Sequence, residues 1–104
     1  MILGYVTCKN VREGKKIARA LVKSKLVACV NIVPRVESVF EWEGKLREEN
    51  EVLLLFKTTR ACMKPATALV KKMHSYGVPC IVFYESTGAS TEFANWVAAS
   101  LCRK

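Results

Sequence analysis

The feature that most constrains this fold is the segment Val52 to Phe56, in which five consecutive side chains are apolar. Successive side chains of a strand point to opposite faces, so a strand with one face in water alternates apolar and polar residues. The segments Val27 to Val33 and Cys80 to Phe83 also depart from alternation. These three segments therefore predict a sheet that is covered on both of its faces.

The stretches between these segments carry helical spacing. Apolar residues recur on one face from about residue 11 to residue 25, and Asn10 with Glu13 three residues later resembles a capping box. A second helix is expected from near Met63 to about His74, and a third over Phe93 to Leu101 with Trp96 on its apolar stripe. Strands are expected at four places, which are Ile2 to Thr7, Val27 to Trp42 with a break at Pro34, Lys45 to Thr58, and Val78 to Glu85.

The resulting order, β-α-β-β-α-β-α, indicates a single α+β domain over residues 1–104. Its first six elements match the ferredoxin-like pattern, in which right-handed crossovers place both helices on one face of a four-stranded sheet. Something else must then cover the other face. We expect another copy of the chain to do so, with the long second and third strands reaching across. The competing arrangement is a monomer whose third helix folds over that face.

Charge and hydropathy narrow the function classes. The net charge of +8 fits either a solvated basic face or an anionic partner. The RNA-recognition motif shares this element order but needs stacking aromatic side chains on its third strand, and Val52 to Lys57 offers no such platform. We therefore expect no nucleic-acid partner.

The apolar runs are far shorter than the ~20 residues of a membrane helix, and we read no signal peptide, so we expect no membrane association and a cytoplasmic location.

Catalytic motifs are not apparent in the sequence. We find no glycine-rich phosphate loop, nucleophile elbow or paired carboxylates, and we expect a protein that is not an enzyme. Acylphosphatases share the fold, and Arg12 and Asn31 could take the roles of their arginine and asparagine, but the glycine-rich cradle between them is absent. Five cysteines without a CxxC spacing favour neither a disulfide framework nor a zinc knuckle.

His74 is the only histidine of the chain. One interpretation is that it closes the second helix, where a cationic side chain favours the carbonyl end of the helix dipole. The other is a metal or small-ligand site, for which Glu51 and a cysteine near the end of the first strand are available partners. A thiolate, an imidazole and a carboxylate together suit a transition metal. The residues alone leave both interpretations open.

Over about residues 3–101, the chain resembles the CutA family of divalent-cation-tolerance proteins. The resemblance rests on residues 26–34 and 38–45, on Glu51 followed by the apolar strand, on His74-x-Tyr76-x-x-Pro79, and on Trp96. It implies a ferredoxin-like subunit in a homotrimer similar to the PII regulatory proteins. It also implies a role in tolerance to copper and other divalent cations, without an established enzymatic activity.

The resemblance also implies site residues. A metal site similar to that of the family would use His74 and Glu51, while Cys8 lies two residues beyond Val6, the position where some members have a cysteine. Ser75 and Cys80 stand where the family usually has a proline and an acidic residue. The ligand cleft would use Trp42, Lys57, Tyr76 and Pro79, and structural roles would fall to Cys29, Asn31 and Trp96.

Three functions follow as hypotheses. The leading one is a homotrimer that binds Cu(2+) or another divalent cation weakly at its subunit clefts, with no tightly bound cofactor. The second is a PII-like regulatory trimer that binds a small anionic effector through Lys57, Tyr76 and Trp42. The third is a non-catalytic adaptor or structural trimer.

Overall fold

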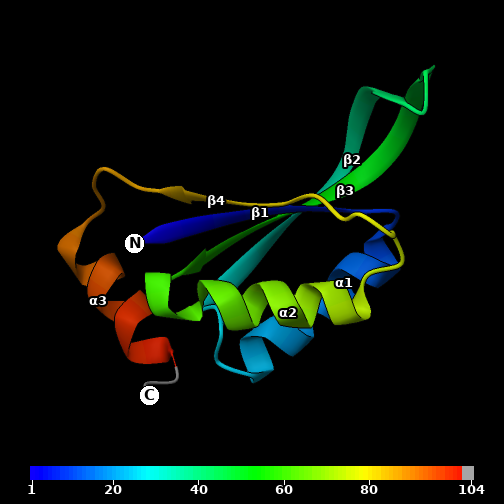
Figure 1. The fold of residues 1–104 in the computed structure, drawn as a ribbon. Coiled ribbons are helices and arrows are strands. Elements are labelled where there is room, and N and C mark those ends of the chain that lie inside the picture. Colours follow the sequence, from blue (N-terminus) through cyan, green and yellow to red (C-terminus); the bar gives the residue numbers. More distant parts are fainter. Residues whose placement is uncertain (102–104) are drawn as a thin grey trace.

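The computed structural model describes residues 1–101 and has the predicted order of elements (Figure 1). Strands β1 (Ile2–Cys8), β2 (Cys29–Trp42), β3 (Lys45–Thr58) and β4 (Ile81–Glu85) form one antiparallel sheet in the order β2-β3-β1-β4. The helices are α1 (Val11–Lys23), α2 (Met63–Met73) and α3 (Thr91–Ser100), and a short 3-10 helix, η1 (Arg60–Cys62), precedes α2. The ferredoxin-like α+β fold class is confirmed. β4 begins at Ile81, three residues later than predicted.

Helix α1 begins with the predicted cap. The Asn10 side chain accepts a hydrogen bond of 2.8 Å from the Glu13 backbone N–H, which satisfies one of the free donors of the first turn. The Glu13 carboxylate does not complete a capping box on Asn10, because it accepts instead from the Lys9 backbone N–H at 3.4 Å. The helix ends where Lys25 takes a left-handed backbone conformation, with φ of 58°.

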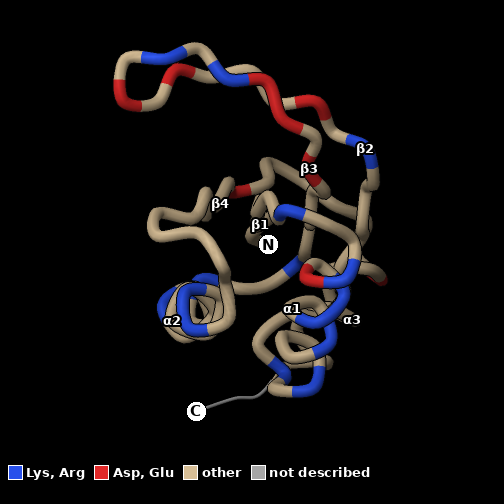
Figure 2. The backbone as a smooth tube through the Cα atoms, turned by 90° about the vertical axis from the view of Figure 1, so that its right-hand side faces the viewer, with Lys and Arg blue, Asp and Glu red and all other residues tan. Residues whose placement is uncertain are grey.

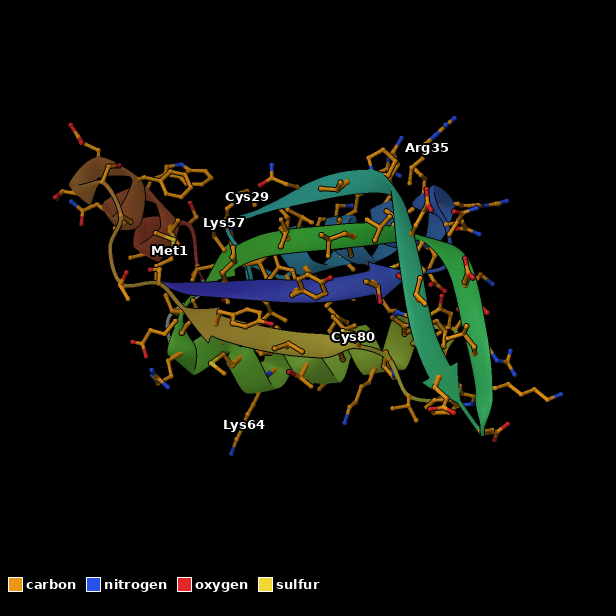
Figure 3. All side chains as sticks on the ribbon, turned by 90° about the horizontal axis from the view of Figure 1, so that it is seen from above. Met1, Cys29, Arg35, Lys57, Lys64 and Cys80 are labelled. Atoms are coloured by element: carbon orange, nitrogen blue, oxygen red, sulfur yellow. The ribbon has the colours of Figure 1, made fainter. Side chains whose placement is uncertain are left out.

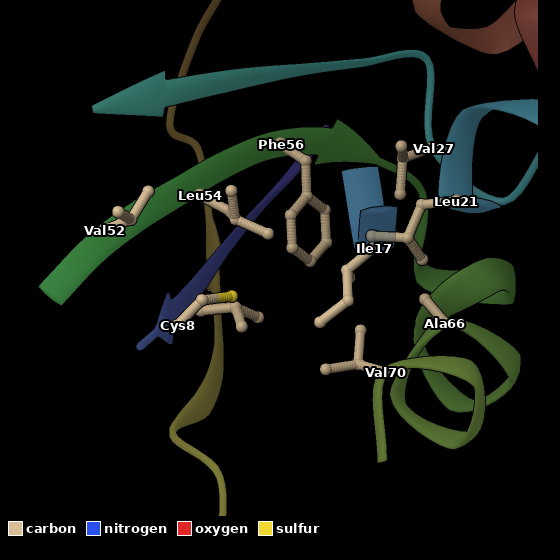
Figure 4. Close-up of a cluster of buried hydrophobic side chains, with 10 residues drawn as sticks. Cys8, Ile17, Leu21, Val27, Val52, Leu54, Phe56, Ala66 and Val70 are labelled. Atoms are coloured by element: carbon tan, nitrogen blue, oxygen red, sulfur yellow. The ribbon is translucent and has the colours of Figure 1, made fainter. Parts of the chain in front are cut away.

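Helices α1 and α2 lie side by side on one face of the sheet (Figure 1). The core between them and the sheet is built from alternate residues of the strands and one stripe of each helix (Figure 4). Its fully buried members include Val6, Cys8, Ile17, Leu21, Leu54, Phe56, Ala66 and Val70. Cys8 is therefore a core residue at the end of β1, which affects its chemistry at the site described below.

The opposite face of the sheet is apolar and uncovered within the chain. Leu3 and Tyr5 of β1 alternate with the core residues, and they pair with Lys57 and Leu55 of β3. On the flanking strands, Val33, Val82 and Tyr84 are exposed. The apolar run Val52 to Phe56 thus has a core face and an open face, as the missing alternation predicted.

Helix α3 does not cover this open face. It packs at the end of the sheet, where Val97 and Leu101 form a second small core with Ala28, Cys62 and Met1. The competing prediction that the third helix folds over this face is therefore wrong. The predicted apolar stripe of α3 is only partly buried, since 48% of Trp96 is exposed and Phe93 is exposed beside it.

The interruption expected at Pro34 is a bulge, one of the two settings, bulges and edges, in which proline interrupts a strand. Val33 pairs with Leu53 and Val36 pairs with Glu51, so two residues of β2 face one of β3 and Arg35 has φ of 63°. Beyond the bulge, residues 36–51 form a hairpin that bends away from the body of the molecule (Figure 1), and we call it the arm. The predicted turn at Glu43-Gly44 is confirmed: both residues have positive φ, as a type I′ turn requires.

Charges are divided between the two parts of the molecule. Basic side chains follow α1 and α2, while acidic ones gather on the arm (Figure 2). Among residues 1–101, no helix is long and apolar enough to cross a membrane.

Candidate functional site

His74 follows the last turn of α2, and its side chain is completely buried. One ring nitrogen, Nε2, lies 2.7 Å from the backbone carbonyl oxygen of Thr7, and the other, Nδ1, accepts a hydrogen bond of 3.1 Å from the Tyr76 backbone N–H. A carbonyl can only accept and an amide can only donate, so this pattern places a proton on Nε2 and a lone pair on Nδ1. His74 also ends α2 as its C-cap residue, as one of the two interpretations predicted.

Tyr76 connects His74 to the predicted partner Glu51. The tyrosine ring lies 4.7 Å from the imidazole, centroid to centroid, and its hydroxyl donates a hydrogen bond of 2.8 Å to Oε2 of Glu51. Burial, the hydrogen bond to Glu51 and nearby carboxylates raise the pKa of Tyr76, so the phenol stays protonated and remains a donor. Tyr76 thus lies between Glu51 and His74, so Glu51 is not beside the imidazole as a second ligand would be.

A different carboxylate lies beside the imidazole. Ligand atoms of Cys8, Glu13 and His74 all lie within 4.8 Å of one another, and Oε1 of Glu13 is 3.9 Å from Nδ1 of His74. The second carboxylate oxygen of Glu13 accepts a hydrogen bond of 3.1 Å from the Ser75 backbone N–H. We call these three residues the donor cluster. It contains two of the three predicted metal ligands, and it has Glu13 in place of Glu51.

Two of these groups have shifted acidities. Burial, together with the charges of Glu13 and Glu51, raises the pKa of the Cys8 thiol to about 12. Burial alone would raise the pKa of Glu13, but hydrogen bonds from Ser75 and Lys9 hold it below its ordinary value. The cluster therefore contains a thiol and a carboxylate beside an imidazole whose Nδ1 accepts a hydrogen bond.

The donor cluster fits a divalent transition metal. Ligand atoms around tetrahedral zinc lie ~3–4 Å apart, so three donors within 4.8 Å need to approach by about 1 Å. The lone pair of His74 is on Nδ1, the nitrogen nearest Glu13, and the Nε2–H group already donates to a backbone carbonyl, as metal-bound histidines usually do. Two obstacles weaken the fit, namely the proton on Cys8 and the Tyr76 amide that occupies Nδ1.

A cleft of about 410 Å³ lies on the other side of Tyr76. One wall is the arm, with Phe40, Trp42, Arg47, Glu49 and Glu51, and the other comprises Thr7 with the segment between α2 and β4, where Tyr76, Gly77, Val78 and Cys80 contribute. Of the four predicted cleft residues, Trp42 and Tyr76 line it. Pro79 lies between two lining residues without lining the cleft itself.

The fourth predicted cleft residue, Lys57, lies elsewhere. It is on the open face of the sheet next to Cys29, and its ammonium group donates to the side-chain oxygen of Asn31 (Figure 3). Cys29 and Asn31, for which structural roles were expected, share this open face and are not part of the core of the chain. The structure therefore places Lys57, Cys29 and Asn31 on the uncovered face of the sheet.

Glu13 is the site residue that the sequence did not predict. Its position three residues after Asn10 is sufficient to explain it as part of a helix cap, and no local signal links it to Ser75, which is 62 residues away. Only the fold brings the start of α1 against the end of α2.

Comparisons with known proteins agree with this architecture. The family model described as CutA1 divalent ion tolerance protein matches residues 2–100. The chloroplastic CutA protein of Arabidopsis thaliana is 44% identical over 99 residues, which cover 95% of this chain and 54% of the relative. The chain spans about half the length of the plant and mammalian relatives that it matches, but 89% of the divalent-cation tolerance protein CutA of Thermus thermophilus.

Solved structures are similar over the whole chain. CutA1 from Oryza sativa matches with a TM-score of 0.96 and 38% identity, covering 99% of this chain and 94% of that one. The divalent cation tolerance protein from Thermus thermophilus matches with a TM-score of 0.95 and 35% identity, covering 98% and 100%.

Proposed function

This chain belongs to the CutA1 divalent ion tolerance family, and we propose that it acts in the response to divalent metal ions as a homotrimer that binds a transition metal weakly. The observation that supports this most directly is the donor cluster, where Cys8, Glu13 and His74 bring a sulfur, an oxygen and a nitrogen within 4.8 Å. Such a mixed set suits copper, zinc or a similar ion better than magnesium or calcium, which prefer oxygen ligands. We propose binding rather than catalysis.

Binding is weak in this proposal because it is coupled to two changes within the chain. Cys8 must lose a proton whose pKa is about 12, and the Tyr76 amide must leave Nδ1 of His74. Thiolate formation costs ~1.4 kcal/mol for each pH unit below the pKa, so the apparent affinity should rise about tenfold per pH unit and one proton should be released per ion.

Cobalt(II) is a suitable probe, because its bond to a thiolate gives a charge-transfer absorption band. We expect this band in the wild type, its loss in Cys8→Ser and its weakening in Glu13→Gln. Cys80→Ser is the matched control, since Cys80 is an exposed thiol outside the donor cluster. A band that survives in Cys8→Ser and disappears in Cys80→Ser would show that the ion binds elsewhere, and the proposal would then fail.

The homotrimer is supported by the uncovered apolar face of the sheet, because Leu3, Leu53 and Leu55 would otherwise contact water. We expect a particle of about three times 11.7 kDa in sedimentation equilibrium. Leu55→Arg should shift it to the monomer, whereas Val22→Arg, at an exposed position of α1 on the other side of the sheet, should have little effect. A wild type that sediments as a monomer would contradict this part of the proposal.

We keep the cytoplasm as the proposed location. The four cysteines among the described residues are free thiols, which suits a reducing compartment. The names of some relatives give other cellular locations: the Arabidopsis protein is called chloroplastic, and the Archaeoglobus fulgidus protein is called periplasmic. Fractionation of the source cells would test the location, and recovery in another compartment would refute it.

The alternative of a small anionic effector is not favoured by the cleft within one chain. Lys57, the basic residue on which it depended, lies on the open face of the sheet instead. The charged side chains that line the cleft are Glu49, Glu51 and Arg47, which leaves one net negative charge.

A further inference from the structure

The arm has the opposite charge to the rest of the molecule. The chain has a net charge of +8 and nine acidic residues, and six of these nine are between residues 36 and 51 (Figure 2). Opposite faces of the arm differ, because successive residues of a strand point to opposite sides. Glu49 and Glu51 point into the cleft, whereas Glu48, between Arg47 and Glu49, is on the other face. The cleft is therefore a negatively charged recess in a basic protein.

The Glu51 carboxylate is only partly satisfied by the chain. The residue is 8% exposed, and its one hydrogen bond within residues 1–101 is the one that Oε2 accepts from Tyr76. Within that part of the chain, every fully buried side-chain oxygen has a partner, so Oε1 of Glu51 must reach solvent. Glu51 lines this cleft and also a second recess beside Lys9 and Arg35, and the Tyr76 hydroxyl that binds its Oε2 belongs to the wall of the cleft. Over the same residues, no lysine or arginine forms an ion pair with it.

Three of the other residues that line the cleft are aromatic, and one, Arg47, is basic. Trp42 is 48% exposed, Phe40 is exposed on the same face of the arm, and Tyr76 faces them from the segment after α2. Aromatic faces attract cations, most strongly when the ring is that of tryptophan. A hydrated metal ion would leave these apolar walls unused, and an anion would meet two carboxylates. An organic cation can use the carboxylates and the rings at the same time.

We propose that this cleft binds a small organic cation, namely an ammonium group attached to an apolar or aromatic body. Its ammonium group would donate to Oε1 of Glu51, and its body would pack between Trp42 and Tyr76. A volume of about 410 Å³ lies within the range of small-molecule sites, roughly 300–1,000 Å³. The inference does not depend on the proposed metal function, because no residue of the donor cluster lines the cleft.

Three probes of one shape and different charge test the proposal: 2-phenylethylammonium, 2-phenylethanol and phenylacetate. The protein has two tryptophans, so Trp96→Phe leaves Trp42, in the cleft, as the only fluorescent indole. With EDTA present, we expect the ammonium compound to quench or shift this fluorescence saturably. Its affinity should exceed that of the alcohol by about tenfold or more, and phenylacetate should not bind. Calorimetry on the wild type checks that the Trp96 substitution is harmless.

Paired variants locate the cation. Glu51→Gln keeps an oxygen for the Tyr76 hydroxyl and removes the charge, so the ammonium compound should bind about tenfold more weakly. Glu48→Gln removes the same charge from the other face of the arm and should change affinity by less than about twofold. Cys8→Ser, which would abolish metal binding, should leave this affinity unchanged.

Four results would overturn the proposal. They are equal binding of the ammonium compound and the alcohol, tighter binding of phenylacetate, no saturable change with any probe, and full displacement of the ammonium compound by magnesium at matched ionic strength. The probe comparison uses variants with an intact cleft, so it remains decisive even if Glu51→Gln fails to fold.

Discussion

Replacing His74 tests whether this residue holds the fold together independently of any metal. The imidazole is completely buried, and it satisfies the Thr7 carbonyl and the Tyr76 amide at 2.7 and 3.1 Å. Alanine would leave both backbone groups without a partner and would create a cavity beneath them. A residue that served only as a metal ligand would cost little to remove from the metal-free protein.

The magnitude follows from these two bonds. Leaving a buried polar group unpaired costs about 1–3 kcal/mol, so His74→Ala should lose about 3–5 kcal/mol of unfolding free energy once the cavity is included. Asparagine can still accept from the amide two residues later, as in an Asx turn, and the glutamine amide nitrogen can take the place of Nε2. We therefore expect His74→Asn and His74→Gln each to recover about half of this loss.

Urea denaturation at one fixed protein concentration, with EDTA, measures these values, because a fixed concentration removes the effect of subunit dissociation. Lys72→Ala, an exposed change two residues earlier in α2, is the control and should stay within about 0.5 kcal/mol of the wild type. If His74→Ala matches this control, or if the asparagine and alanine variants are equally unstable, the hydrogen-bonding role assigned to His74 is wrong.

Three further predictions concern the core and the donor cluster. Gly4→Ala should lower the free energy of unfolding by about 3 kcal/mol or more, because the new Cβ would overlap the buried ring of Phe56. The control is Gly14→Ala, whose Cβ would lie 3.3 Å from the nearest side chain. It should stay within about 1 kcal/mol of the wild type in the same urea assay. The Cys8 thiol, with its pKa raised to about 12, should resist iodoacetamide at neutral pH until the protein unfolds, as peptide mass spectrometry would show; rapid labelling of the native protein would contradict this. Because the pKa of Glu13 is lowered in the folded state, its carboxylate stabilises the fold above its ordinary pKa, and this stabilisation is lost as the pH falls through the lowered value. Glu13→Gln should therefore lose less unfolding free energy on acidification than the wild type does. An unchanged pH profile would refute this.

The fold was predictable because its signals are local or repeat along the chain. Asn10 and Glu13 mark a helix start, Glu43-Gly44 marks a hairpin turn, and the missing alternation in Val52 to Phe56 marks a strand with two apolar faces. Each signal depends on residues a few positions apart. Pro34 was harder to interpret, since a proline without a backbone donor fits either the end of a strand or a bulge, and the pairing with β3 decides between them.

The site was predicted less well because it depends on contacts between distant parts of the chain. His74, Cys8, Tyr76 and Glu51 were all identified, and a cysteine was expected beside His74, but Glu13 and the contact of Tyr76 with Glu51 were not predicted. The sequence order of Glu51 and His74 gives no indication that the Tyr76 hydroxyl lies between them. Lys57 was assigned to the cleft because it has the charge that an anionic ligand needs, yet it points to the open face of the sheet. The alternation of side chains along β3 explains this position, because Lys57 lies between the core residues Phe56 and Thr58 and so points to the opposite face.

Tyr76 joins the two proposed sites, which leads to a dependence between them. Its backbone amide occupies Nδ1 of His74, the nitrogen that a metal would need, and its hydroxyl holds Glu51 at the edge of the cleft. Release of the amide from the imidazole therefore displaces the residue that positions the cleft carboxylate. Coupling between two sites is reciprocal, so zinc should change the affinity for 2-phenylethylammonium by the same factor as this cation changes the affinity for zinc. Tyr76→Phe removes the hydroxyl but keeps the amide, and it should reduce the coupling while leaving zinc binding in place. Equal coupling in wild type and Tyr76→Phe would mean that the two sites communicate by another route.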